Sequence, residues 1–130
     1  MLLQQYLTPF LKYFPTRKME DFFDFHNSHA TIKPHYKNFV QFKKHNLVHD
    51  PMNEKFDIIF CRNVMIYFDE KLKAQVLKLL ESSLKDGGFL IIGYYDIMPD
   101  TGKKIFDLFD VRTRIYRKKV TNPMTKTLKP

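Results

Sequence analysis

The spacing of apolar residues predicts a helix at the start of the chain and short strands after it. Six apolar residues recur at intervals of three and four, the pattern of an amphipathic helix over residues 1–14. They are Leu2, Leu3, Tyr6, Leu7, Phe10 and Leu11. Three aromatic and β-branched runs follow at residues 22–25, 30–32 and 39–42, separated by turn-forming residues. We therefore expect a small antiparallel β-subdomain over residues 15–43.

The middle of the chain holds two continuous apolar runs with a helical pattern between them. Residues 56–61 and 89–93 are predicted strands buried on both faces, as in a parallel sheet. Asp69 is placed to cap a helix that ends at residues 85–88 and has an apolar stripe along one side. The stripe consists of Leu72, Val76, Leu77, Leu79, Leu80 and Leu84. Strand, crossover helix and strand predict a right-handed βαβ unit.

The last third of the chain continues the α/β pattern. A short helix is predicted at residues 103–109 and a final strand at residues 111–118. Residues 44–120 then form one α/β segment, and residues 121–130, rich in Pro, Thr and Lys, are predicted to be a flexible tail. The fold class predicted from the pattern is α/β.

Composition and charge narrow the class of protein. A chain of 130 residues suits a single modest core, and 44% hydrophobic residues argue against overall disorder. Cys61 is the single cysteine and no apolar run is long enough to cross a bilayer, so we expect a cytoplasmic protein without membrane insertion. The net charge of +8 favours an anionic partner. Residues 112–119 are typical of a solvated basic strand, so nucleic acid is not the partner we expect. The five histidines are irregularly spaced and predict no metal site.

Candidate chemistry lies directly after the two apolar strands. In an open parallel sheet, ligands bind beyond the carboxyl ends of the strands, which places Arg62, Asn63, Tyr94 and Tyr95 at the candidate site. From the residues alone, Arg62 also suits an ordinary surface position and Asn63 a helix cap. Cys61 suits a small apolar filler better than a nucleophile, because no base is near it in the sequence.

Three sequence motifs make this pattern specific. The run FDIIFCRNVMIYF at residues 56–68 matches every fixed position of FDxIFCRNVxIYF, the signature of the CheR family of chemoreceptor glutamate methyltransferases. The run LKDGGFL at residues 84–90 is similar to LKPGGxL before the fifth strand of many class I methyltransferases. Residues 40–42, followed by Asn46 and Leu47, are similar to the third strand of the family and its Asn-Leu pair. The chain thus resembles the C-terminal part of a CheR-type methyltransferase domain.

The resemblance implies a cofactor, a reaction and a set of site residues. The cofactor would be S-adenosyl-L-methionine, leaving S-adenosyl-L-homocysteine as product. Asn46 and Leu47 would border the adenine, and Arg62 and Asn63 would approach the cofactor from the end of the fourth strand. Tyr67 would stand beside the reacting centre, where it would orient an acceptor glutamate of a methyl-accepting chemotaxis receptor or another protein. Alignment and desolvation would supply most of the acceleration.

The sequence lacks several features of the complete family fold. Class I methyltransferases order their sheet 3-2-1-4-5-7-6, and we find candidates only for strand 3 and strands 4 to 7. All four glycines lie at or after Gly87, so no glycine-rich turn follows an early strand. The family usually has Gly-His-Ser-Glu where Gly93, Tyr94, Tyr95 and Asp96 stand here. We expect a partial Rossmann-like sheet, and we expect the chain alone to be inactive.

Two functions remain open at this point. The first is a protein-glutamate O-methyltransferase, and the second is an inactive protein-binding module derived from that family. Without its neighbour, the strand at residues 56–61 would expose an edge, which favours a homodimer. In some family members the β-subdomain binds a receptor tether peptide. Residues 15–20 replace the glycine-containing loop of those members, so tether binding is not expected here.

Overall fold

The computed structural model describes residues 18–27 and 29–120, which fall into two compact units, 1–44 and 45–130. The predicted leading helix over residues 1–14 and the predicted tail over residues 121–130 lie outside the described residues.

The first unit contains a β-hairpin. A 3-10 helix, η1 (Met19–Asp21), precedes strands β1 (Phe23–His26) and β2 (His29–Ile32), and helix α2 (Pro34–Lys37) follows. The two strands pair antiparallel in a separate sheet, which confirms the predicted antiparallel element. Helix α2 begins with a proline at its first turn, a position that proline favours.

The prediction of a strand at residues 39–42 is wrong. No strand is assigned there; the amide of Phe39 donates to Tyr36 O and that of Val40 to Lys37 O, so the chain leaves α2 through a turn. Phe39 is 85% exposed and Phe42 is 95% exposed, so the apolar run packs against nothing in the described part of the chain. A strand needs a pairing neighbour, and none of the described residues provides one.

The second unit is built on a four-stranded mixed sheet. Its strands are β3 (Phe56–Cys61), β4 (Leu84–Ile92), β5 (Phe106–Asp110) and β6 (Ile115–Lys118), in the spatial order β3-β4-β6-β5. β3 and β4 are parallel, and the other two pairings are antiparallel. This order corresponds to strands 4-5-7-6 of the class I methyltransferase sheet. The predicted α/β fold is confirmed, and β3 is an edge strand among the described residues.

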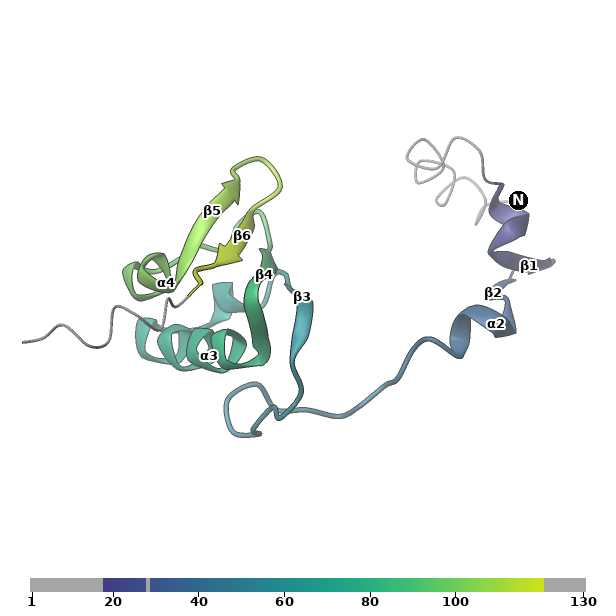
Figure 1. Ribbon diagram of the computed structural model, residues 1–130. Helices are drawn as coiled ribbons and strands as arrows, with labels where there is room; N and C mark the ends of the chain where they lie inside the picture. The colour runs from purple at the N-terminus through teal and green to yellow at the C-terminus, as the bar shows by residue number, and fades with distance from the viewer. Residues whose placement is uncertain (1–17, 28, 121–130) are drawn as a thin grey trace, which may run out of the picture. The chain divides into compact units, whose positions relative to one another are not determined.

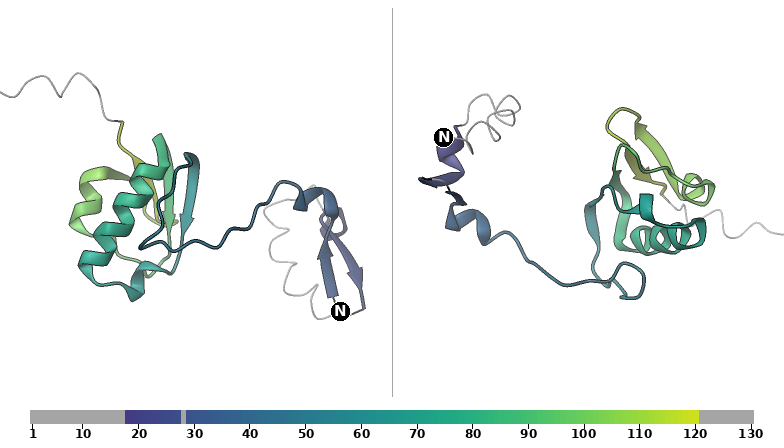
Figure 2. Two further views of the ribbon diagram at one scale, coloured as in Figure 1. Left: turned by 90° about the horizontal axis from the view of Figure 1, so that it is seen from below. Right: turned by 180° about the vertical axis from the view of Figure 1, so that it is seen from behind.

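Helix α3 (Glu70–Ser83) connects the two parallel strands as predicted. Asp69 is its N-cap, and the carboxylate accepts a hydrogen bond of 2.8 Å from the amide of Leu72. The predicted apolar stripe provides the buried residues Val76, Leu77 and Leu80. Figure 2 shows α3 and α4 (Asp100–Ile105) on the same face of the sheet. The core therefore lies between this face and the two helices.

The last third of the chain forms a β-hairpin instead of the short helix predicted at residues 103–109 and the single strand predicted at residues 111–118. Helix α4 ends at Ile105, and β5 starts at the buried Phe106 and pairs with β6. The turn is built by Asp110, whose Oδ1 accepts the amides of Arg112 and Thr113 at 2.8 and 3.1 Å. These two hydrogen bonds lower the pKa of Asp110 from its usual 3.8. The predicted boundaries are wrong here because β5 is stabilised by its pairing with β6, which the apolar periodicity of residues 106–110 does not indicate.

Candidate functional site

The candidate site lies where β3 and β4 end. The two strands run parallel and Cys61 pairs with Ile92, so Arg62 and Gly93 leave the sheet at the same edge. Tyr94 and Tyr95 follow at once and are 64% and 72% exposed. The structure thus places the predicted strand-end residues at one end of the sheet, as expected for a class I ligand site.

A buried carboxylate joins the two strand ends. Asp96 is fully buried, and its Oδ2 accepts the amides of Asn63 and Gly93, each at 2.7 Å. Its Oδ1 accepts the amide of Ile66 at 3.1 Å. The sequence analysis noted Asp96 as a departure from the family pattern and did not predict this role. The role could not be predicted because all three hydrogen-bond donors are main-chain amides, which every residue type except proline carries.

The backbone around this carboxylate is tightly constrained. Asn63 adopts a positive φ of 58°, a conformation that asparagine tolerates better than most residues. A Cβ on Gly93 would lie 2.6 Å from Asn63 N and Oδ1 and 2.7 Å from Asp96 Oδ2. Only glycine therefore fits at this position without a shift of the loop.

Tyr67 lies on a short turn just after this junction. The 3-10 helix η2 (Met65–Tyr67) has its first residue fully buried, and Phe68 packs against the core. Tyr67 between them is 81% exposed. The turn is therefore anchored on both sides of the tyrosine, and its ring faces outward close to Asn63 in the chain.

Asn46 and Leu47 lie in a turn that is held against helix α3. Asn46 Oδ1 accepts the amide of Val48 at 2.9 Å, and its own amide donates to Asp50 Oδ2 at 2.7 Å, which closes a compact turn. Gln75 on α3 donates to Val48 O at 2.7 Å, and Leu47 packs against the core. Of the five predicted site residues, Arg62, Asn63 and Tyr67 gather at the end of β3, whereas Asn46 and Leu47 are held by α3.

The comparison with protein families decides the lineage. The family described as "CheR methyltransferase, SAM binding domain" matches residues 5–115, which is most of the chain. The chain belongs to the CheR methyltransferase family. S-adenosyl-L-methionine is therefore the cofactor associated with this domain.

Individual relatives agree with the family match. A chemotaxis protein methyltransferase of Vibrio parahaemolyticus is 41% identical over 80 residues, which cover 61% of this chain and 29% of the relative. Chemotaxis protein methyltransferase 1 of Vibrio cholerae is 40% identical over 80 residues, with the same two shares. The chemotaxis protein methyltransferase of Listeria innocua is 42% identical over 62 residues, covering 48% of this chain and 24% of the relative. The matched region thus spans less than a third of each of these relatives.

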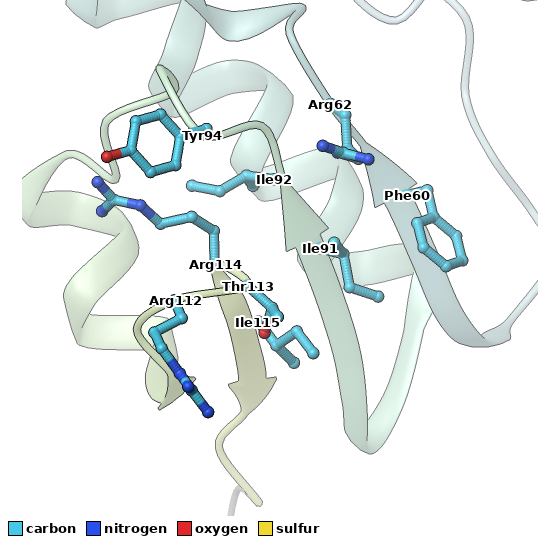
Figure 3. Close-up of a pocket in the computed structure, with 9 residues that line it drawn as sticks. All are labelled: Phe60, Arg62, Ile91, Ile92, Tyr94, Arg112, Thr113, Arg114 and Ile115. Carbon is cyan, nitrogen blue, oxygen red and sulfur yellow. The ribbon is translucent and has the colours of Figure 1, made fainter. Parts of the chain in front are cut away.

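The CheR-type strand ends border an open pocket of about 470 Å³, shown in Figure 3. Its floor is apolar, with Ile91 and Ile115 among the lining residues, and Arg62, Arg112 and Arg114 contribute positive charge. The guanidinium of Arg114 lies 5.7 Å from the ring centroid of Tyr94, within cation–π range. Arg114 Nε is buried and has no hydrogen-bond acceptor among the described residues. The rim of the pocket is therefore electropositive.

The donor set fits one side of the family cofactor. Asn46 and Asn63 carry exposed amide side chains, and Leu47 is a half-buried apolar side chain. Such groups suit hydrogen bonding and packing around an adenosyl group. No set of three or more metal-ligating side chains occurs within residues 18–27 and 29–120.

Cys61 is a packing residue of this CheR-type site. It is 5% exposed at the end of β3. Burial first, and the nearby charge of Asp96 second, raise the pKa of its thiol to about 11. The neutral thiol dominates at physiological pH, so Cys61 is a poor nucleophile. No helix of the described residues is long and apolar enough to cross a membrane.

Proposed function

We propose that this chain provides the C-terminal part of the cofactor-binding domain of a protein-glutamate O-methyltransferase that acts on chemotaxis receptors in the cytoplasm. The observation that carries the proposal is the sheet order β3-β4-β6-β5, with the CheR signature crossing the end of β3. The names of the relatives, chemotaxis protein methyltransferase, support the receptor as the class of substrate.

The proposed roles follow the position of each residue. Asn46 and Leu47 border the adenine, and Arg62 and Asn63 contact the cofactor from the end of β3. Tyr67, anchored on both sides and 81% exposed, orients the acceptor glutamate. The bound cofactor supplies an electrophilic methyl group on a sulfonium. That methyl would pass to an acceptor carboxylate oxygen, with the carbon–sulfur bonding pair kept by S-adenosyl-L-homocysteine as the product. The protein aligns the carboxylate in line with the breaking bond and excludes water.

The cofactor affinity of the chain by itself is expected to be low. All four glycines lie at or after Gly87, so no early glycine-rich turn offers backbone amides to the methionine end of the cofactor. The residues named above hold the adenosyl end only. We therefore expect binding without turnover unless the remaining strands of the family fold are supplied.

The alternative function is an inactive protein-binding module that associates with itself. One observation favours it: β3 is an edge strand among the described residues, and its Ile58 and Phe60 are 51% and 71% exposed. An apolar edge of this kind can pair with the same strand of a second copy. The net charge of +8 opposes close self-association, which is why we rank the alternative second.

Calorimetric titration with S-adenosyl-L-homocysteine separates the two functions. Saturable one-to-one binding supports the methyltransferase domain, whereas no heat, together with a concentration-dependent dimer in sedimentation, supports the module. Asn63→Gly keeps the positive φ of 58° accessible and removes the amide side chain, so it should weaken binding. Asn53→Ala, an exposed asparagine in the loop before β3, is the matched control and should bind like wild type. Equal affinities of the two variants would contradict the role of Asn63.

A further inference from the structure

Asp96 is a charged group in a place where burial is costly. Its side chain is fully buried, and no ion pair to Asp96 occurs within residues 18–27 and 29–120. A buried carboxylate without compensation is strongly destabilising. The compensation comes from the three main-chain amides of Asn63, Ile66 and Gly93.

The three donors belong to two separate loops. Gly93 lies three residues before Asp96, whereas Asn63 and Ile66 lie 33 and 30 residues away. The last pair of the parallel ladder is Cys61 with Ile92, so the carboxylate acts just beyond the sheet. Its hydrogen bonds therefore fix the loops after β3 and β4, while the pairing of the strands themselves is already complete.

We propose that Asp96 is a positioning residue for the cofactor and acceptor site. Its carboxylate holds Asn63 in the left-handed conformation and fixes the turn that carries Tyr67. It acts through these two residues and touches no ligand itself. The inference rests on the proposed function, because its consequence for binding depends on Asn63 and Tyr67 facing the ligand.

An isosteric variant gives a specific expectation. Asp96→Asn replaces one acceptor oxygen by an NH2 group without changing the size of the side chain. Oδ2 serves two donors and Oδ1 serves one, so the amide oxygen should stay with Asn63 and Gly93. The NH2 group would then face the amide of Ile66, and that hydrogen bond is lost.

Two readouts report this change. Amide exchange at Ile66 should accelerate by about tenfold or more, while exchange at Gly93 stays close to wild type. Affinity for S-adenosyl-L-homocysteine should fall by about tenfold, because the loop from Asn63 to Ile66 is then held by one of its two hydrogen bonds to residue 96 and the Asn63 side chain loses its fixed position toward the cofactor. A purely structural role would lower the stability of the fold without this local pattern of exchange.

Asp110→Asn is the matched control. Asp110 also accepts two main-chain amides and carries the same charge, but it lies in the β5–β6 turn and serves neither Asn63 nor Ile66. Its Oδ1 alone accepts both amides, so the asparagine keeps them. This variant should match wild type in affinity and in exchange at Ile66. Equal loss of affinity in both variants would overturn the proposal and leave net charge as the cause.

The remaining outcomes are also decisive. Unchanged exchange at Ile66 in Asp96→Asn overturns the proposal, and so does accelerated exchange with wild-type affinity. If wild type itself binds no S-adenosyl-L-homocysteine, the proposed function fails, and the positioning role fails with it even when exchange shows that Asp96 holds both loops. Should Asp96→Asn not fold, the scalar coupling across the hydrogen bond from Ile66 N to Asp96 Cγ is measured in wild type, and its absence overturns the proposal.

Discussion

Replacing Gly93 by alanine tests how closely the two strand ends are packed. The added Cβ would lie 2.6 Å from both Asn63 N and Asn63 Oδ1 and 2.7 Å from Asp96 Oδ2. Ordinary contacts of this atom begin at about 3.4 Å, so three neighbours must move by about 0.7–0.8 Å. Overpacking of this kind costs about 1–3 kcal/mol, and weakening one hydrogen bond to a charged group adds about 1.5–3 kcal/mol. We expect Gly93→Ala to lower the free energy of unfolding by about 2.5–6 kcal/mol.

Urea unfolding followed by circular dichroism measures this loss as a shift of the midpoint at unchanged slope. Asn53→Ala is the control, because this exposed side chain lies in the loop before β3 and its truncation adds no atom to the core. It should cost much less than Gly93→Ala. A loss below about 1 kcal/mol for Gly93→Ala would refute the packing argument, because an overpacked contact alone costs at least that much.

Three further changes have defined outcomes. Lys118→Met removes the buried ammonium that donates to the carbonyls of Glu81 and Leu84 at 2.9 Å each, and should lower the free energy of unfolding by about 2–4 kcal/mol in thermal melts. Asp69→Ala removes the cap of α3 and should cost about 1 kcal/mol in the same melts; a loss as large as that of Lys118→Met would contradict the cap as the cause. The thiol of Cys61 has its pKa raised to about 11, so its alkylation rate should keep rising above pH 9 in the folded protein, whereas a plateau near pH 9 would contradict burial of the thiol.

The βαβ unit could be predicted because its signals are local. A continuous apolar run predicts β3. Apolar residues that recur with the 3.6-residue period of a helix, after the N-cap Asp69, predict α3. β4 was predicted from residue 89, but it begins at Leu84, because Phe56 pairs with Leu84 before the irregularity in the ladder. The start of β4 is thus set by its neighbour, which the sequence does not display.

Elements that depend on distant partners were harder to predict. The sequence of β5 has a helical pattern, and the segment is a strand because it pairs with β6. Residues 39–42 have the pattern of a strand, but none of the described residues pairs with them. The role of Asp96 could not be predicted for a related reason, because its carboxylate accepts hydrogen bonds from main-chain amides 30 and 33 residues away in the sequence. The predicted roles of Asn46, Leu47, Arg62, Asn63 and Tyr67 remain proposals for binding studies to test.

Two buried side chains of opposite charge hold the two ends of the βαβ crossover by hydrogen bonds. Asp96 holds its beginning at Asn63 and Ile66, and Lys118 holds its end at the carbonyls of Glu81 and Leu84, helped by Asp86 at 3.3 Å. Both charges bind mainly main-chain atoms, which every amino acid carries. Replacing the side chain of Ile66, Glu81 or Leu84 therefore leaves these main-chain hydrogen bonds available, whereas replacing Asp96 or Lys118 removes them. Pairwise covariation of Asp96 with Ile66, and of Lys118 with Glu81 or Leu84, should accordingly be weak.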